Sequence, residues 1–82
     1  MHMDNRVAIV AIIVEDTESI QQVNDFLHQY SQHIIGRMGL PYRTRKICII
    51  SIVMDAPQDE VSALAGKLGK LSGVSVKTLF SK

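Results

Sequence analysis

Two aliphatic segments of strand length constrain the fold of this chain more than any other feature. Residues 7–14 read VAIVAIIV, and residues 46–54 read KICIISIVM. Both are short, continuous and rich in β-branched residues, a composition typical of buried strands. Alternate side chains of a strand point to opposite faces of its sheet, and here both alternating sets are apolar. A sheet that contains these strands must therefore be covered on both of its faces.

An amphipathic helix is predicted after each of these strands. Behind the first strand, apolar residues recur at the spacing of one helix face, and Asp16 or Thr17 can cap that helix. Behind the second strand, Asp55 can act as the N-cap, with Pro57 in the first helical turn. The two apolar stripes consist of Ile20, Val23, Leu27 and Tyr30, and of Val61, Leu64, Ala65 and Leu68.

The 82 residues are enough for one domain and too few for two. The predicted order of elements is strand, helix, strand, strand, helix, strand. The second strand, residues 33–38, is followed by Gly39, Leu40 and Pro41, which interrupt regular structure. We therefore predict an α+β fold of the ferredoxin-like βαββαβ type, with a four-stranded antiparallel sheet and two helices on one face. The predicted strands are 6–14, 33–38, 46–54 and 73–80, and the predicted helices are 17–30 and 57–69.

The sheet face turned away from the helices is predicted to be apolar. Helices on one side leave the other side exposed in a monomer, and contiguous apolar patches beyond a few hundred Å² are rare on soluble monomers. A domain of this size also gains much stability from a partner subunit. We expect a homodimer or homotetramer formed through sheet faces. The residues expected in the oligomer interface or the core are Val7, Ile9, Ile13, Ile47, Ile49 and Val53.

Composition and charge exclude several classes of partner. The formal net charge of +1 gives no general attraction to nucleic acid or to an anionic membrane. An RNA-binding sheet needs aromatic side chains on its central strands, and residues 7–14 and 46–54 contain none. The longest apolar run has eight residues, whereas a membrane-spanning helix needs about 20. A single cysteine and the lack of a signal-peptide pattern favour a reducing cytoplasm.

The sequence shows no constellation of catalytic residues. Acylphosphatase-like activity on this fold needs an arginine in the loop after the first strand, where this chain has Glu15, Asp16 and Thr17. A Ser/His/Asp set, a carboxylate pair and a phosphate-binding glycine loop are also missing. Cys48 lies among isoleucines, where a thiol is normally buried and inert. We expect a non-catalytic protein without a cofactor; the alternative within the enzyme class is a site assembled between subunits.

Basic residues are concentrated in residues 36–46, which hold four of the nine Lys and Arg residues. An anionic ligand or an acidic partner can dock on such a segment. The alternative interpretation is a solvated turn whose glycines serve its backbone. The candidate contact residues are Arg37, Tyr42, Arg43 and Arg45.

A metal-binding sensor is the alternative function, with His28, His33 and Cys48 as its ligands. Nickel-responsive regulators place a His-X-His pair shortly before a strand cysteine, and residues 45–47 (Arg-Lys-Ile) do not match it. The competing interpretation is a solvated helix histidine, a histidine at a strand entry and a core cysteine. We therefore expect no bound metal.

Three segments carry a family resemblance: IIGRMGLPY at 34–42, ICIISIVMDA at 47–56 and ALAGKLGKLSGVSVKT at 63–78. Together they resemble the family of proposed regulators of the iron-only hydrogenase system. The resemblance implies an ACT-like form of the ferredoxin-like fold, related to the effector domain of nickel-responsive repressors, and oligomers built through the sheets. It also implies a regulatory, ligand-sensing role exerted through a small molecule or a partner protein.

Two differences between this sequence and related regulatory domains limit the ways in which the chain is expected to act. ACT domains commonly bind an amino acid with a glycine-containing loop between the first strand and helix, and residues 15–18 contain no glycine. As a transcriptional regulator, the chain is not expected to bind DNA directly, because no ribbon-helix-helix or helix-turn-helix precedes Arg6. Action through a partner protein or a bound small molecule is the expectation that remains.

Overall fold

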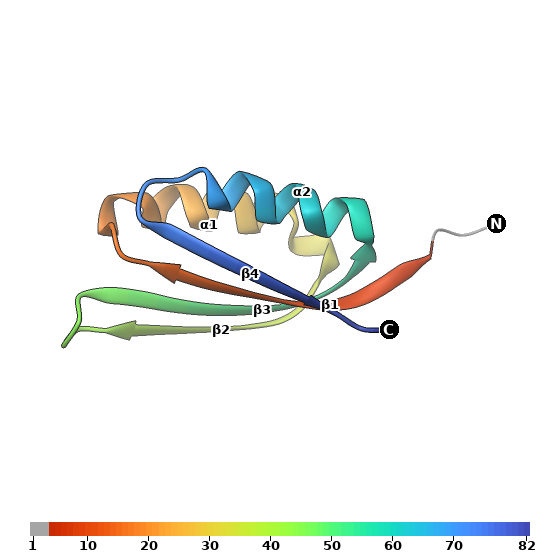
Figure 1. The fold of residues 1–82 in the computed structure, drawn as a ribbon, viewed down its shortest axis with the longest axis horizontal. Coiled ribbons are helices and arrows are strands. Elements are labelled where there is room, and N and C mark those ends of the chain that lie inside the picture. Colours follow the sequence, from red (N-terminus) through yellow and green to blue (C-terminus); the bar gives the residue numbers. More distant parts are fainter. Residues whose placement is uncertain (1–3) are drawn as a thin grey trace.

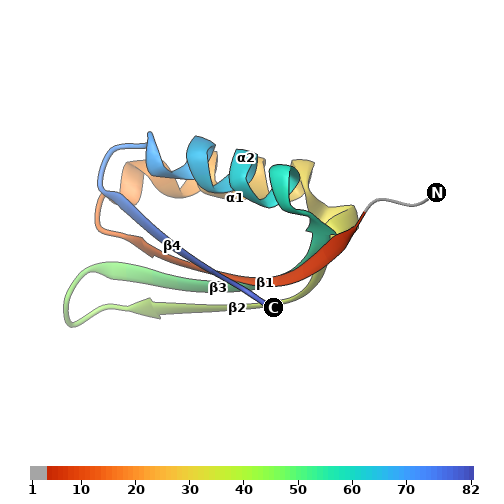
Figure 2. The same cartoon turned by 45° about the vertical axis from the view of Figure 1, so that its right-hand side comes forward.

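The computed structural model describes residues 4–82, which form one sheet and two helices (Figure 1). The strands are β1 (Asn5–Val14), β2 (Ile34–Tyr42), β3 (Ile47–Pro57) and β4 (Val74–Phe80). The helices are α1 (Ile20–Gln29) and α2 (Gln58–Gly69), and turns of 3-10 helix at Thr17–Ser19 and Ser31–His33 flank α1. Seen from two directions, both helices lie on the same face of the sheet, and no part of residues 4–82 covers the other face (Figures 1 and 2).

The strands are antiparallel and follow the order β2-β3-β1-β4 across the sheet. The two aliphatic strands β1 and β3 lie at the centre, and they pair along their whole length from Asn5 and Pro57 to Val14 and Cys48. The arrangement confirms the predicted α+β, ferredoxin-like fold with its antiparallel sheet and both helices on one face.

The hydrophobic core lies between the helices and the sheet face that they cover. Alternate residues of β1 and β3 enter this core, and the covering helices contribute the apolar stripes expected from the sequence. Burial removes these side chains from water almost completely, which is the main stabilising contribution in a domain of this size. The fully buried residues are Val10, Ile12, Val14, Ile52, Met54, Ala56, Val23, Val61, Leu64 and Leu68.

Strand β2 is longer than the sequence analysis predicted. It was expected to end at residue 38, but it continues through Gly39 and Pro41 to Tyr42. Because β2 lies at the edge of the sheet, half of its N–H groups face away from β3, and an edge strand tolerates proline there. A register shift between Ile34 and Gly36 marks a bulge early in the strand.

The start of the second helix also differs from the prediction. Asp55 was expected to cap it, but β3 extends to Pro57 and Asp55 pairs with Val7 inside the sheet. Pro57 itself occupies the N-cap position of α2 and supplies no side-chain hydrogen bond. Asp16 caps the 3-10 turn that precedes α1, where its carboxylate accepts a hydrogen bond of 3.0 Å from the Glu18 N–H. The N-cap of α1 itself is Ser19, which makes no side-chain hydrogen bond to the helix.

The loop after β1 is fastened to the turn before β4. The Glu15 N–H donates to the Gly73 carbonyl over 2.7 Å, and the Ser19 hydroxyl donates to the Ser72 carbonyl over 2.7 Å. Gly73 has a positive φ of 67°. A Cβ atom at Gly73 would lie 2.6 Å from Cβ of Asp16, so the two loops meet where only a glycine fits.

The opposite end of β1 is held by Arg6. Its Nη1 donates to Oε1 of Gln58 over 2.8 Å, and its Nε donates to the Ser81 carbonyl over 3.2 Å. The guanidinium also covers the ring of Phe80, 4.9 Å from its centroid, a favourable cation–π distance. Arg6 therefore ties β1 to the start of α2 and to the end of β4.

Candidate functional site

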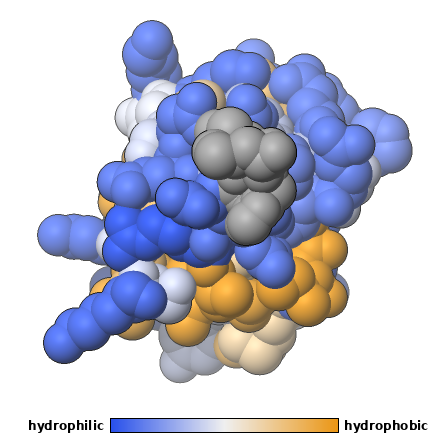
Figure 3. All heavy atoms as spheres, turned by 90° about the vertical axis from the view of Figure 1, so that its right-hand side faces the viewer, coloured by the Kyte–Doolittle hydropathy of each residue, from blue (hydrophilic) through white to orange (hydrophobic). Residues whose placement is uncertain are grey.

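The face of the sheet away from the helices carries a continuous set of apolar side chains, and we call it the open sheet face. Within it, Ile9 of β1 lies between Val53 of β3 and Leu79 of β4. In a space-filling view, hydrophobic residues gather along the sheet side of the molecule, while the helix side is polar (Figure 3). Its large apolar residues that are 41% to 69% exposed are Val7, Ile9, Ile13, Met38, Leu40, Tyr42 and Leu79.

The six residues predicted for an interface or the core all lie on the open sheet face. In β1 they are exposed, and in β3 they are half-buried. The core on the helix side is built from the alternate residues of the same strands. The six residues are Val7, Ile9, Ile13, Ile47, Ile49 and Val53.

The charged groups of the open sheet face lie toward its periphery, and the uncharged Ser51 stands in its middle, between Ala11 and Met38. Asp55 stands opposite Val7 near the end of β3, and Lys77 stands opposite Ala11 on the edge strand β4. Where β1 begins and β4 ends, a shallow hollow of about 280 Å³ is lined mainly by apolar side chains, among them Val7 and Leu79. An apolar centre with charges at its margin is the usual composition of a protein–protein interface.

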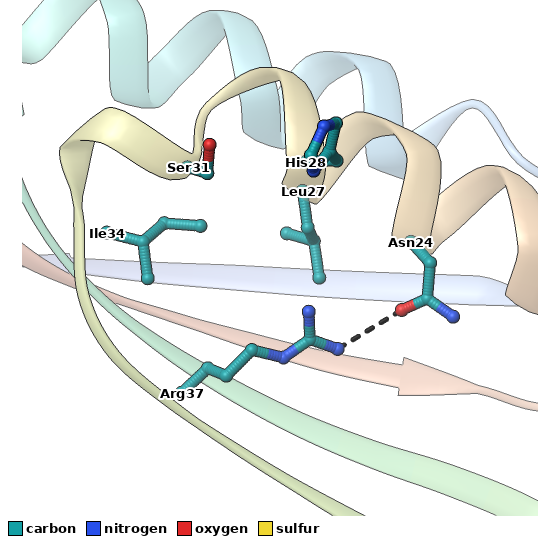
Figure 4. Close-up of a pocket in the computed structure, with 6 residues that line it drawn as sticks. All are labelled: Asn24, Leu27, His28, Ser31, Ile34 and Arg37. Atoms are coloured by element: carbon teal, nitrogen blue, oxygen red, sulfur yellow. Dashed lines mark hydrogen bonds between the residues drawn. The ribbon is translucent and has the colours of Figure 1, made fainter.

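A second concave feature lies on the helix side, between α1 and β2, and we call it the α1–β2 cavity. It has a volume of about 310 Å³. The Arg37 side chain points from β2 toward α1, and its Nη2 donates to Oδ1 of Asn24 over 3.1 Å (Figure 4). Leu27 is buried, Ile34 is half-buried and the other lining residues are exposed. The cavity is lined by Asn24, Leu27, His28, Ser31, Ile34 and Arg37.

The predicted basic contact segment is divided by the structure. Arg43 and Arg45 are exposed in the turn between β2 and β3, which projects beyond the helices at one end of the molecule (Figures 1 and 2). Tyr42 belongs to the open sheet face at the same end. Arg37, by contrast, pairs with Ile52, about 17 Å along the strand from Tyr42 at the usual rise per residue. The four residues therefore do not form one contact.

The structure does not bring the three residues of the metal-binding alternative together. His33 immediately precedes Ile34, which pairs with Met54, whereas Cys48 lies at the other end of β3. Six residues of strand separate Cys48 from Met54, which is about 20 Å, so these side chains cannot share one ion. His28 is exposed on α1. In the part of the chain that the structure describes, no group of three or more His, Cys, Asp or Glu side chains could hold a metal ion.

Several residues of the α1–β2 cavity were not singled out by the sequence analysis. Asn24 and Ser31 are seven residues apart, a spacing that places them on the same side of α1 and its following turn. That spacing was visible in the sequence, but nothing there showed that Arg37 would face them. The bulge before Gly36 decides which face of the sheet Arg37 takes.

Known proteins are similar to this chain in sequence and fold. Residues 6–78 match the family model TM1266-like, described as "Iron-only hydrogenase system regulator, putative". The chain belongs to this family. The solved structure of the uncharacterized protein TM1266 from Thermotoga maritima is similar, with a TM-score of 0.92 and 40% sequence identity over 96% of this chain and 100% of that one. No curated protein matches the chain.

The family membership confirms the resemblance seen in the three sequence segments, of which the first is the whole of β2 and the second is most of β3. Within residues 4–82, no helix is long and apolar enough to span a membrane.

Proposed function

We propose that this chain is a non-catalytic regulatory module of an iron-only hydrogenase system and that it acts as a homodimer whose open sheet faces pack together. The observation that carries the proposal is the exposed apolar face of the sheet in a member of a regulator family. The proposed partner that covers this face is a second copy of the chain, because the same face on both subunits gives a closed two-fold interface.

The size of the open sheet face supports this choice. Its seven exposed apolar residues present roughly 600 Å² per subunit, near the ~800 Å² that each partner contributes to a standard interface. The half-buried Ile47, Ile49 and Val53 lie between them and add to the area. The charged Asp55 and Lys77 stand at the margins, where they keep contact with water instead of being buried.

The assembly is tested by a charge placed at the centre of the open sheet face. Ile9→Lys puts an ammonium group between Val53 and Leu79, where a facing apolar sheet would bury it. At micromolar concentration, light scattering is expected to give the wild type at least twice the subunit mass of 9.1 kDa and the variant the single mass. Because the Ile9 side chain is already 42% exposed in the single subunit, the fold should persist by circular dichroism.

Gln22→Lys is the matched control, since it adds the same charge at an exposed position of α1 on the other side of the molecule. It is expected to leave the mass unchanged. A monomeric wild type, or an Ile9→Lys variant that still assembles, would refute the proposed interface.

The regulatory role is tested in the host of the protein. Deleting the gene is expected to change the transcript level or the activity of the iron-only hydrogenase, and the wild-type gene should restore it. Restoration by Gln22→Lys but not by Ile9→Lys would link the role to self-association. If the transcript level and the activity of the hydrogenase are unchanged by the deletion, the regulatory proposal is contradicted.

The turn between β2 and β3 is the proposed contact with a partner protein. Arg43 and Arg45 are exposed there at the free end of the hairpin, whereas Tyr42 just before them belongs to the open sheet face. Guanidinium groups in such a position pair with carboxylates of an acidic surface. The turn lies beyond the helices, so a partner can reach it while the sheets of two copies are packed together.

A further inference from the structure

Arg37 occupies an unusual place for a charged residue. It pairs with Ile52, which is fully buried on the helix side of the sheet, so its side chain leaves β2 on the side where the core lies. Figure 4 shows the Arg37 side chain running from β2 toward α1 instead of away from the protein. The Arg37 side chain is still exposed to solvent, so a ligand from solution can reach its guanidinium group.

The partner that Arg37 has is neutral. Its Nη2 donates to the amide oxygen of Asn24 over 3.1 Å, and among residues 4–82 no carboxylate lines the α1–β2 cavity. A guanidinium has five N–H donors in a planar fork that fits a carboxylate through two parallel hydrogen bonds. The Asn24 bond engages one of these donors and fixes the orientation of the fork.

The remaining lining of the cavity has two parts. Leu27 and Ile34 provide an apolar wall, and they are more buried than the rest of the lining. His28 and Ser31, from the end of α1 and the turn after it, add polar groups at the rim. The volume of about 310 Å³ is at the small end of the range of ligand cavities.

We propose that the α1–β2 cavity binds a small organic acid, whose carboxylate pairs with Arg37 and whose short apolar part lies against Leu27 and Ile34. A free phosphate would satisfy the guanidinium but leave the apolar wall uncovered, and a neutral apolar molecule would leave the charge unmatched. This inference deepens the proposed function, because a regulator needs a signal molecule. Only the regulatory significance of the binding rests on the proposed function; the binding itself does not. The cavity lies within one subunit, so binding is measured independently of assembly.

The test is a titration of the isotope-labelled full chain, followed by amide NMR shifts, with hexanoate, its neutral analogue hexanamide and inorganic phosphate. Hexanoate is expected to shift the amides of Asn24, Leu27, Ser31 and Arg37, and to bind at least about tenfold more tightly than either of the other two. Arg37→Gln is expected to weaken hexanoate binding roughly tenfold to hundredfold, since it removes a charge-assisted pair. Arg37→Lys keeps the charge without the fork, so it should weaken binding less.

Arg43→Gln is the matched control, because it removes the same charge at an exposed position outside the cavity. It should leave hexanoate binding unchanged. Equal binding of hexanamide or phosphate, an equal loss in Arg43→Gln, or no shift with hexanoate would each overturn the proposed site. In that case Arg37 merely covers the sheet edge with its aliphatic stem.

The two proposals fail separately. If the wild type is monomeric by light scattering but hexanoate still shifts the cavity amides, the sheet-face dimer is wrong and the binding site stands. If the wild type is a dimer and the cavity amides do not respond, the binding site is wrong and the dimer stands.

Discussion

Gly73→Ala is predicted to be among the most destabilising exposed substitutions in this chain. Two effects add at this position. An alanine at a φ of 67° must adopt the left-handed region, which costs roughly 1–2 kcal/mol for a residue with a Cβ. The new Cβ would also lie 2.6 Å from Cβ and 2.7 Å from the backbone nitrogen of Asp16, far inside van der Waals contact.

Relief of that contact requires the two loops to separate. The neighbouring hydrogen bond of 2.7 Å from Glu15 to Gly73 would stretch at the same time, and overpacking of this kind typically costs about 1–3 kcal/mol. Together the free energy of unfolding should fall by about 2–5 kcal/mol. Since a chain of this length has a total stability of only about 4–12 kcal/mol, the variant should lose a large fraction of its stability.

The assay is urea unfolding followed by circular dichroism at one fixed protein concentration, because self-association makes stability depend on concentration. With a slope near 1 kcal/mol per M, the midpoint should fall by at least about 2 M. Gly66→Ala is the control, because it lies in α2 and a Cβ there meets nothing within 4 Å. That variant should be slightly more stable than the wild type. A loss below about 1 kcal/mol in Gly73→Ala, within the range of ordinary surface changes, would refute the reasoning.

Two further predictions concern the core and the basic turn. Leu64→Ala removes a fully buried side chain of α2 and should lower the free energy of unfolding by about 2–5 kcal/mol; a urea midpoint like that of the wild type would contradict the assigned core. Arg43→Gln combined with Arg45→Gln should leave stability and molar mass unchanged, because both side chains are exposed. The double variant should nevertheless fail to restore the hydrogenase transcript level or activity in the deletion host. Full restoration would show that the turn is not a partner contact.

Much of the fold was predictable because it depends on local patterns. The aliphatic runs identify β1 and β3, and the helix spacing of Val61, Leu64 and Leu68 identifies α2. The predicted end of β2 was wrong for a physical reason. Gly39 and Pro41 disfavour a central strand, but β2 is an edge strand, which tolerates them. The position of a strand in the sheet cannot be deduced from its local sequence.

The candidate sites were less predictable because they depend on register. The open sheet face follows from the apolar character of both faces of β1 and β3, so it could be anticipated. The position of Arg37 could not, because the bulge between Ile34 and Gly36 shifts every later residue of β2 by one place. The separation of His33 from Cys48 likewise becomes visible only when the pairing of β2 with β3 is known.

Because both faces of β1 are apolar, burial of hydrophobic side chains does little to specify the register in which β1 pairs with its neighbouring strands. In most half-exposed strands, a slip by one residue moves polar side chains into the core and is rejected on that ground. In β1 such a slip would only exchange one aliphatic set for another, for example Ile13 for Ile12. The correct alignment must then be encoded at the ends of the strand, by the bond from Glu15 to Gly73 and by the contacts of Arg6 with Gln58 and Ser81. Residues outside the core therefore set the alignment of a strand whose core residues alone do not fix it.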